Sequence, residues 1–315
     1  MGVNFLQAVS GGGASIELNY TNPFIDRHDT SMTVSLYSQL LYRFSGSSFG
    51  SSASPTDERY TERRTGGGLG FVRPIGEHTS ASVGARFEGI KTSNLNNVNP
   101  NNYIRQDGTI LIGQLGLLRN TRDVDLDPSR GNWAQILVEP GFANITDIGG
   151  AVAANTNILG RNNFLRTTLE YRQYYTPQPP RGRQLDAPRR VFAFRTRLGF
   201  INGNVPFAEQ FFAGGADTVR GYQDDRFWGK NMFLANLEYR HPIQRAFNAI
   251  AFIDYGGAWG GYGTVGSFTQ FERPKMNLGY GLGVSFKTPL GPIRLDVGFN
   301  ERGGSRTHFL IGTSF

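Results

Sequence analysis

The sequence of 315 residues contains no cysteine. This absence excludes catalysis by a thiolate, zinc sites built on cysteine, and iron–sulfur clusters. Long apolar runs are also missing, because no stretch approaches the ~20 residues that a membrane-spanning helix needs. The first five residues lack the basic start and the apolar core of a secretory signal peptide. If the protein is exported, we therefore expect this chain to be a mature domain or a fragment cut from a longer chain.

Residue patterns typical of nucleic-acid binding, metal binding or catalysis are scarce as well. The net charge of +7 raises the question of nucleic acid, but the arginines alternate with apolar residues instead of gathering in one patch, so we expect no nucleic-acid partner. The four histidines fall at predicted turns or strand ends, without metal-ligand spacing. A Gly-x-Ser-x-Gly pattern at 46–50 lies in a Ser/Gly-rich stretch, not in a strand-to-helix turn. We therefore expect no catalytic residues, no metal site and no cofactor.

The main signal that is present is the alternation of apolar and polar residues. Leu278, Tyr280 and Leu282 belong to one face of a segment whose other face carries glycines. Similar alternation recurs in segments that begin near residues 14, 81, 165, 192 and 293, and the last of these is predicted to point Arg294 and Asp296 inward. Segments of about ten residues suit tilted transmembrane strands, and a barrel needs an apolar surface only on its outer face. The negative mean hydropathy of −0.35 is therefore compatible with a membrane location.

The connections between these segments alternate in length. Short turns fall at 76–78 and 241–244, whereas long loops fall at 45–60, 92–107, 146–161, 203–230 and 260–276. Short turns on one side of the membrane and long loops on the other are typical of outer-membrane barrels. We count about fourteen strands and find no linker. The sequence thus predicts an all-β fold, a transmembrane antiparallel up-and-down β-barrel that forms a single domain over residues 1–315.

The most distinctive stretch runs from Phe211 to Tyr222 and reads FFAGGADTVRGY. It resembles the sixth-loop signature of the BamA/TamA superfamily, also called the bacterial surface antigen family. That superfamily includes FhaC-type secretion transporters and organellar outer-membrane translocon barrels. The resemblance implies that the long loop 203–230 folds back into the barrel lumen. It also implies a functional motif made of Gly214, Gly215, Val219, Arg220, Gly221 and Tyr222.

The resemblance implies partners for Arg220 as well. In the family, the Arg-Gly-aromatic tip contacts acidic residues on the next two strands, which correspond here to Glu238 and Asp254. The alternation places both carboxylates on the inward face, and an arginine fork can bind carboxylates bidentately. The alternative is a solvated loop charge beside ordinary lumen polarity. We favour the lumenal clamp.

Further matches extend this resemblance along the chain. Residues 20–24 resemble a strand end of the family, and residues 122–131 resemble its acidic Pro–Gly periplasmic turn. Phe309, Ile311 and Phe315 resemble the C-terminal assembly signal, although Thr313 occupies a position that is usually apolar. Family members normally have sixteen strands and carry periplasmic POTRA modules. We therefore expect the N-terminal POTRA modules and possibly the first strands to be absent, unless the chain belongs to a shortened branch.

Inward charges outside the loop receive a simpler interpretation. They are predicted to line the lumen generally, and to set ion selectivity if the barrel conducts. These residues are Arg166, Glu170, Arg172, Arg195 and Arg197.

The resemblance implies an assembly or translocation barrel in the bacterial outer membrane, with an organellar outer envelope as the less favoured location. Such a protein would insert outer-membrane proteins or pass polypeptides through a lateral seam, helped by the lumenal VRGY loop, and would not be an enzyme. Its partners would be the lipid bilayer, unfolded outer-membrane or secreted polypeptide clients, and a POTRA-bearing segment or partner. A passive pore, or a membrane anchor for a passenger domain, is the alternative. A soluble β-sandwich lectin or enzyme is a third possibility, which the long strand segments disfavour.

Overall fold

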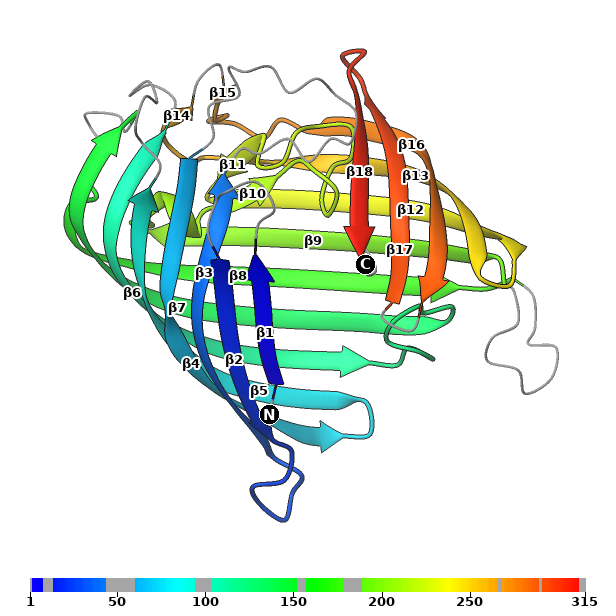
Figure 1. Cartoon of the computed structure of the whole chain (residues 1–315), viewed down its shortest axis with the longest axis horizontal. Helices are drawn as coiled ribbons and strands as arrows, with labels where there is room; N and C mark the ends of the chain where they lie inside the picture. The colour runs from blue at the N-terminus through cyan, green and yellow to red at the C-terminus, as the bar shows by residue number, and fades with distance from the viewer. Residues whose placement is uncertain are drawn as a thin grey trace.

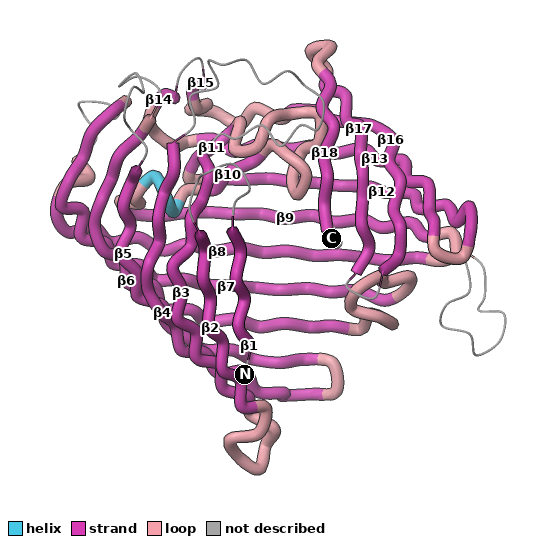
Figure 2. The backbone as a smooth tube through the Cα atoms, in the orientation of Figure 1, coloured by secondary structure: helices cyan, strands magenta, loops and turns pink. Residues whose placement is uncertain are grey.

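The computed structural model describes residues 2–7, 14–43, 60–93, 103–151, 157–177, 189–265, 268–288 and 291–311. Strands make up most of this part of the chain, and η2 (Phe207–Glu209) is a short helical turn (Figure 2). The strands are β1 (Gly2–Gln7), β2 (Ala14–Asn22), β3 (Ser31–Arg43), β4 (Tyr60–Gly76), β5 (Thr79–Ser93), β6 (Ile104–Asn120), β7 (Gly131–Gly150), β8 (Gly160–Tyr175), β9 (Val191–Gly203), β10 (Phe211–Ala213), β11 (Phe227–Gly229), β12 (Asn231–Gln244), β13 (Phe247–Trp259), β14 (Thr264–Val265), β15 (Phe268–Thr269), β16 (Asn277–Thr288), β17 (Gly291–Asn300) and β18 (Ser305–Ile311). Within these ranges, we find no helix with the length and apolar character of a membrane span.

Fourteen of the strands form one antiparallel sheet in which each strand lies beside its neighbour in the chain. β9 pairs with β12, while β10–β11 and β14–β15 form two small separate sheets. Figure 1 shows the large sheet curling until its edge strands, β1 and β18, come to the same side of the molecule. Between those two edges, no pairing occurs within the described residues. The predicted all-β up-and-down architecture with about fourteen strands is confirmed.

The outer face of the sheet is apolar. On β16 and β17, the side chains of Tyr280, Leu282 and Leu295 are exposed, whereas Arg294 and Asp296 on the opposite face are buried. This arrangement follows from the period of two in a strand, which sends successive side chains to opposite faces. The faces assigned from the alternation are therefore the faces observed.

The inner face differs from the polar lining that the sequence predicted. We call the end of the barrel where β9 leads into loop 203–230 the loop side, and the end with the tight β4–β5 connection the turn side. Toward the loop side, a cluster of inward positions on β5–β9 is apolar and packs against apolar residues of the loop. The wall residues are Ile90, Ile110, Ile112, Ala143, Ile145, Phe164 and Ile201, and the loop residues include Val205, Phe211, Val219, Tyr222 and Phe227. Charged residues occupy the inner face from its middle toward the turn side, and on β4 they extend toward the loop side with Arg64 and Glu62.

The predicted alternation of connection lengths fails on both sides of the barrel. The turn-side connection between β6 and β7 is an ordered loop, in which Asp123 accepts hydrogen bonds from the Ser129 backbone N–H (2.9 Å) and the Arg130 backbone N–H (3.2 Å). The loop-side connection between β17 and β18 is short, since Asn300 ends one strand and Ser305 begins the next. Strands also reach into the predicted loops 92–107 and 146–161. The predicted loop 203–230 does begin where β9 ends and finish where β12 begins.

Candidate functional site

The loop 203–230 runs inside the curled sheet and carries the VRGY motif at its tip. β10 and β11 pair antiparallel within the loop and close a hairpin whose connection holds the motif. Gly214 and Gly215 have φ of 109° and 94°, a left-handed conformation that glycine adopts without strain. The Gly214 backbone N–H donates to Thr218 Oγ1 at 2.7 Å, which tightens the connection. The hairpin directs Arg220 onto the inner wall formed by β12, β13 and β17.

Arg220 binds Asp254 of β13 through three donors. Its Nε lies 2.7 Å from Asp254 Oδ2 and its Nη2 lies 2.8 Å from Asp254 Oδ1, the parallel geometry of a bidentate pair. The backbone N–H of Arg220 also donates to Asp254 Oδ2, at 3.0 Å. One carboxylate therefore fixes both the side chain and the backbone at the loop tip.

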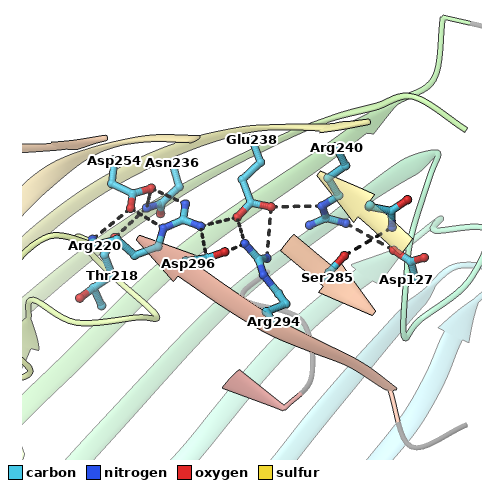
Figure 3. A network of polar contacts seen from close by, with 11 residues as sticks. Asp127, Thr218, Arg220, Asn236, Glu238, Arg240, Asp254, Ser285, Arg294 and Asp296 are labelled. Atoms are coloured by element: carbon cyan, nitrogen blue, oxygen red, sulfur yellow. Dashed lines mark hydrogen bonds and ion pairs between the residues drawn. The ribbon is translucent and has the colours of Figure 1, made fainter. Parts of the chain in front are cut away.

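Two further carboxylates accept hydrogen bonds from the remaining nitrogen of the Arg220 guanidinium (Figure 3). Arg220 Nη1 donates to Glu238 Oε1 of β12 at 2.7 Å and to Asp296 Oδ2 of β17 at 3.1 Å. Arg294 lies between these carboxylates, with Nη2 2.9 Å from Glu238 Oε1 and 2.8 Å from Asp296 Oδ2. The side chains of all three acids are 0% exposed, so the network is sealed from water.

Neighbouring groups fix the orientation of these acids. Asn236 donates from Nδ2 to Asp254 Oδ1 at 2.8 Å and to the Thr218 carbonyl at 2.7 Å, which ties β12, β13 and the loop together. The Arg220 guanidinium lies 3.5 Å from the ring centroid of Phe252, a cation–π contact in a dry site. Since Asn236 pairs with Asp254 and Glu238 with Phe252 in the β12–β13 register, the strand pairing itself brings these groups to one place.

Glycine allows the loop tip to approach the wall this closely. Gly221 has a φ of 91°, and its backbone N–H donates to His308 Nε2 of β18 at 3.2 Å. Its carbonyl accepts a hydrogen bond from Asn300 Nδ2 at 2.7 Å. A Cβ at Gly279 of β16 would lie 2.0 Å from the Arg220 carbonyl oxygen, so a side chain there would displace the loop tip.

The network continues toward the turn side. Arg240 of β12 donates from Nε to Glu238 Oε2 at 3.1 Å, and its Nη1 lies 3.7 Å from Asp127 Oδ1. Asp127 belongs to the connection between β6 and β7, and its Oδ2 lies 2.6 Å from Lys287 Nζ of β16. A chain of charges therefore joins the loop tip to a connection at the other end of the barrel (Figure 3).

The predicted lining residues of β8 and β9 form a second group, which contacts the loop where Arg195 Nη2 donates to the Asp217 carbonyl at 2.7 Å. Arg172 Nε lies 2.7 Å from Glu170 Oε1, with Arg195 Nε at 3.9 Å from the same oxygen and Arg197 Nε at 3.5 Å from Glu170 Oε2. Three arginines thus surround one glutamate. Arg166 is separate from them and pairs with Glu139, at 2.7 Å from Nε to Oε2.

The C-terminal assembly signal is described only in part. Phe309 lies on the outer face of β18 and is 46% exposed. Ile311 pairs with Ile293 in the ladder, while Thr313 and Phe315 lie outside the described residues. The functional role predicted for this segment stays a prediction.

Sequence reasoning placed Asp296 and Arg294 on the inward face but did not assign them to the Arg220 site. The signal that was available is the run of three glycines in the middle of the inner face of the neighbouring strand, Gly279, Gly281 and Gly283. An inner face without side chains predicts that something else occupies that volume. Within the described ranges, no group of three or more histidine or acidic side chains is arranged to hold a metal ion.

Comparison with known proteins gives consistent results at the level of family and fold. The family description "Omp85 superfamily domain" matches residues 5–315. Outer envelope protein 80, chloroplastic, of Arabidopsis thaliana is 34% identical over 124 residues, which cover 38% of this chain and 17% of that protein. Outer membrane protein assembly factor BamA of Nitratidesulfovibrio vulgaris is 23% identical over 332 aligned positions, covering 97% of this chain and 37% of that protein.

A solved structure shares the fold. The crystal structure of BamA from Haemophilus ducreyi lacking POTRA domains 1–3 matches with a TM-score of 0.63 at 16% identity, covering 95% of this chain and 60% of the solved chain. The chain thus spans less than two thirds of each of these relatives.

Proposed function

Because the chain belongs to the Omp85 superfamily, a superfamily of outer-membrane β-barrels, we propose that it assists the insertion of outer-membrane proteins through a seam between β1 and β18. The similarity to an outer membrane protein assembly factor supports this function over the translocation of secreted polypeptides. The observation that carries the proposal is the position of the loop tip. Gly221 is hydrogen-bonded to His308 of β18, the strand at the open edge of the sheet.

An open sheet edge can act on an unfolded client by strand addition. The edge strands β1 and β18 each pair with another strand on one side only within the described residues, and an edge of this kind can accept an additional strand. A client strand that adds to such an edge satisfies its own N–H and C=O groups. In lipid, each unsatisfied group costs several kcal/mol, so pairing before insertion removes a large part of the barrier.

In this mechanism the loop supports the C-terminal edge. Arg220 ties β12, β13 and β17 together through Glu238, Asp254 and Asp296. Asn300 of β17 and His308 of β18 hold the adjacent glycine. With the loop tip in place, the last strands keep a fixed register while their outer edge remains open.

A passive pore is less compatible with this arrangement. Apolar residues of the loop pack against apolar residues of the wall on the loop side, so the loop fills that part of the lumen instead of leaving an aqueous path. A membrane anchor for an attached domain would keep the same packing, and the experiment below separates it from an assembly factor.

The test is a client-folding assay. The protein, with any natural N-terminal extension, is reconstituted into liposomes, and the folding of an added unfolded outer-membrane protein is followed by heat-modifiable gel mobility. We expect faster client folding than with empty liposomes, and loss of most of the acceleration in Arg220→Lys, which keeps the charge but not the fork. Arg197→Gln, which changes an inward arginine outside the Arg220 site, serves as the matched control and should retain the acceleration.

Two outcomes would contradict the proposal. Client folding at the rate of empty liposomes would leave an anchor role. Acceleration that survives Arg220→Lys in a barrel whose loop has moved would show that the loop does not support the seam.

A further inference from the structure

The loop carries a second buried charge, of opposite sign, at its other end. Glu209 ends the helical turn η2 and is 1% exposed. Its Oε1 lies 2.7 Å from Arg64 Nη1 of β4, and its Oε2 lies 2.9 Å from Arg86 Nη2 of β5 and 3.0 Å from Arg166 Nη1 of β8. One carboxylate on the loop is therefore held by three arginines from three strands of the wall.

The backbone beside Glu209 is fixed by the same wall. Arg64 Nη2 donates to the Ala208 carbonyl at 2.8 Å, so this arginine holds both the side chain and the main chain of η2. The Phe207 backbone N–H donates to Gln106 Oε1 of β6 at 2.7 Å, and the Phe207 ring packs with Trp228 of β11. Arg64 thus holds this part of the loop in the same way as Asp254 holds the Arg220 end. In both cases one wall residue binds a loop side chain and the loop backbone beside it.

The arginines that bind Glu209 also have acidic partners of their own in the wall. Arg64 lies 2.7 Å from Glu62 and 3.1 Å from Glu88. Arg86 pairs with Glu88 as well, and Arg166 pairs with Glu139. These neighbours keep the arginines in place, so that the site is organised by the wall before the loop contributes its charge.

The two charged ends of the loop contact different parts of the sheet. Glu209 binds β4, β5 and β8, whereas Arg220 binds β12, β13 and β17. The segment between them crosses from one wall to the other and includes β10. A loop held at one end only could rotate about that end, but one held at both ends has a single position relative to both walls.

We propose that Glu209 is a second positioning residue of the lumenal loop, which fixes the loop to the N-terminal half of the barrel as Arg220 fixes it to the C-terminal half. The loop then connects the two walls across the lumen, with a carboxylate bound by three arginines at one site and a guanidinium bound by three carboxylates at the other. This inference rests on the proposed function only for its effect on client folding. The position of the loop can be measured independently.

The test uses the absence of natural cysteine from the chain. A cysteine introduced by Ala208→Cys reports on the Glu209 end, and one introduced by Val219→Cys reports on the Arg220 end. Labelling of each reporter by a membrane-impermeant thiol reagent is timed in the folded, reconstituted protein. In Glu209→Gln we expect labelling at position 208 to accelerate about tenfold or more, because the charged acceptor that three arginines share is removed from the loop. Labelling at position 219 should stay within about twofold, since the Arg220 contacts are intact.

The matched control is Glu170→Gln. Glu170 is also an inward carboxylate with three arginines around it, but it belongs to β8 and not to the loop. It should leave labelling at position 208 unchanged. Arg86→Gln removes one partner of Glu209 from the wall and should accelerate labelling at position 208 by a smaller factor.

The possible results separate this proposal from the proposed function. Unchanged labelling at position 208 in both Glu209→Gln and Arg86→Gln would overturn it, and so would equal acceleration at positions 208 and 219, which would indicate general loosening of the barrel. Acceleration at position 208 alone supports it, whether or not client folding slows. If client folding does not respond in a chain whose loop end is released, the proposed function needs revision but the positioning role stands.

Discussion

The two charged ends of the loop, Arg220 and Glu209, differ in the net charge that the wall around each would have without it. Without Arg220, its site holds Glu238, Asp254 and Asp296 against Arg294 and Arg240, three negative charges against two positive ones. Adding Asp127 and Lys287 keeps the excess of one negative charge. The wall at this end is therefore not balanced in the absence of the loop.

Without Glu209, its site is balanced. Arg64, Arg86 and Arg166 remain, against the three glutamates Glu62, Glu88 and Glu139 with which they already pair. These arginines are 11–20% exposed, compared with 2% for Arg220 and Arg294. The Arg220 end is thus required for the charge balance of a dry site, while the Glu209 end can separate from a wall that remains neutral and partly hydrated.

The largest effect that tests this contrast is expected for Arg220→Ala. Removing one partner of a buried ionic network leaves uncompensated charge, which costs about 3–5 kcal/mol. We expect a large loss of the heat-modifiable folded form and a lower free energy of unfolding in urea, measured in lipid vesicles. Arg220→Lys should fall between this variant and the wild type, because it restores charge without the bidentate fork. Equal stability of Arg220→Ala and wild type would show that Arg220 is not needed for the charge balance of its site, and would contradict the contrast with Glu209.

A smaller loss is expected for Glu209→Gln. Each arginine keeps another carboxylate, so only the loop contacts are lost, at about 1–3 kcal/mol. The same urea titration should place this variant between the wild type and Arg220→Ala. Glu139→Gln removes the carboxylate that Arg166 binds through two hydrogen bonds, at 2.7 and 2.9 Å, and should destabilise at least as much as Glu209→Gln. A smaller loss for Glu139→Gln than for Glu209→Gln would show that the arginines depend more on the loop carboxylate than on their partners in the wall.

Ionic strength sharpens the comparison further. At 1 M salt the screening length falls to about 3 Å, and interactions of partly hydrated groups weaken more than those of dry ones. The difference in unfolding free energy between wild type and Glu209→Gln should therefore shrink between 0.1 M and 1 M NaCl. The corresponding difference for Arg220→Lys should change little. Equal salt dependence of the two differences would mean that the two sites are hydrated alike.

The sequence was sufficient for the fold and for one end of the loop. Alternation over β16 and β17 assigned the faces of Leu282 and Arg294 correctly, because the apolar outer surface imposes a strict period of two. Glu238 and Asp254 could be named because the family resemblance implied acidic partners on the two strands after the motif, and the alternation put both carboxylates on the inward face.

The Glu209 end could not be found in the same way. Arg64, Arg86 and Arg166 precede Glu209 by 145, 123 and 43 residues, and each lies on a strand that carries at least one other inward charge. No local pattern selects them, because their meeting depends on the curvature of the whole sheet.

The apolar inner face was missed for a related reason. Runs such as Ile110–Ile112 are apolar on both faces, which indicates cover on both sides, but the cover comes from a distant loop.

The smallest effect is expected at the far end of the charge network. Asp127 joins Arg240 and Lys287, but it is 28% exposed, Lys287 is 40% exposed, and the closest approach to Arg240 is 3.7 Å. Exposed ion pairs contribute about 0–1 kcal/mol, so Asp127→Asn should change the unfolding free energy by no more than that. Arg240 keeps its bond to Glu238, so thiol labelling at position 219 should also stay at the wild-type rate. Faster labelling there would mean that the connection between β6 and β7 controls the loop tip through Arg240. The Arg220 end would then respond to contacts made at the turn side of the barrel.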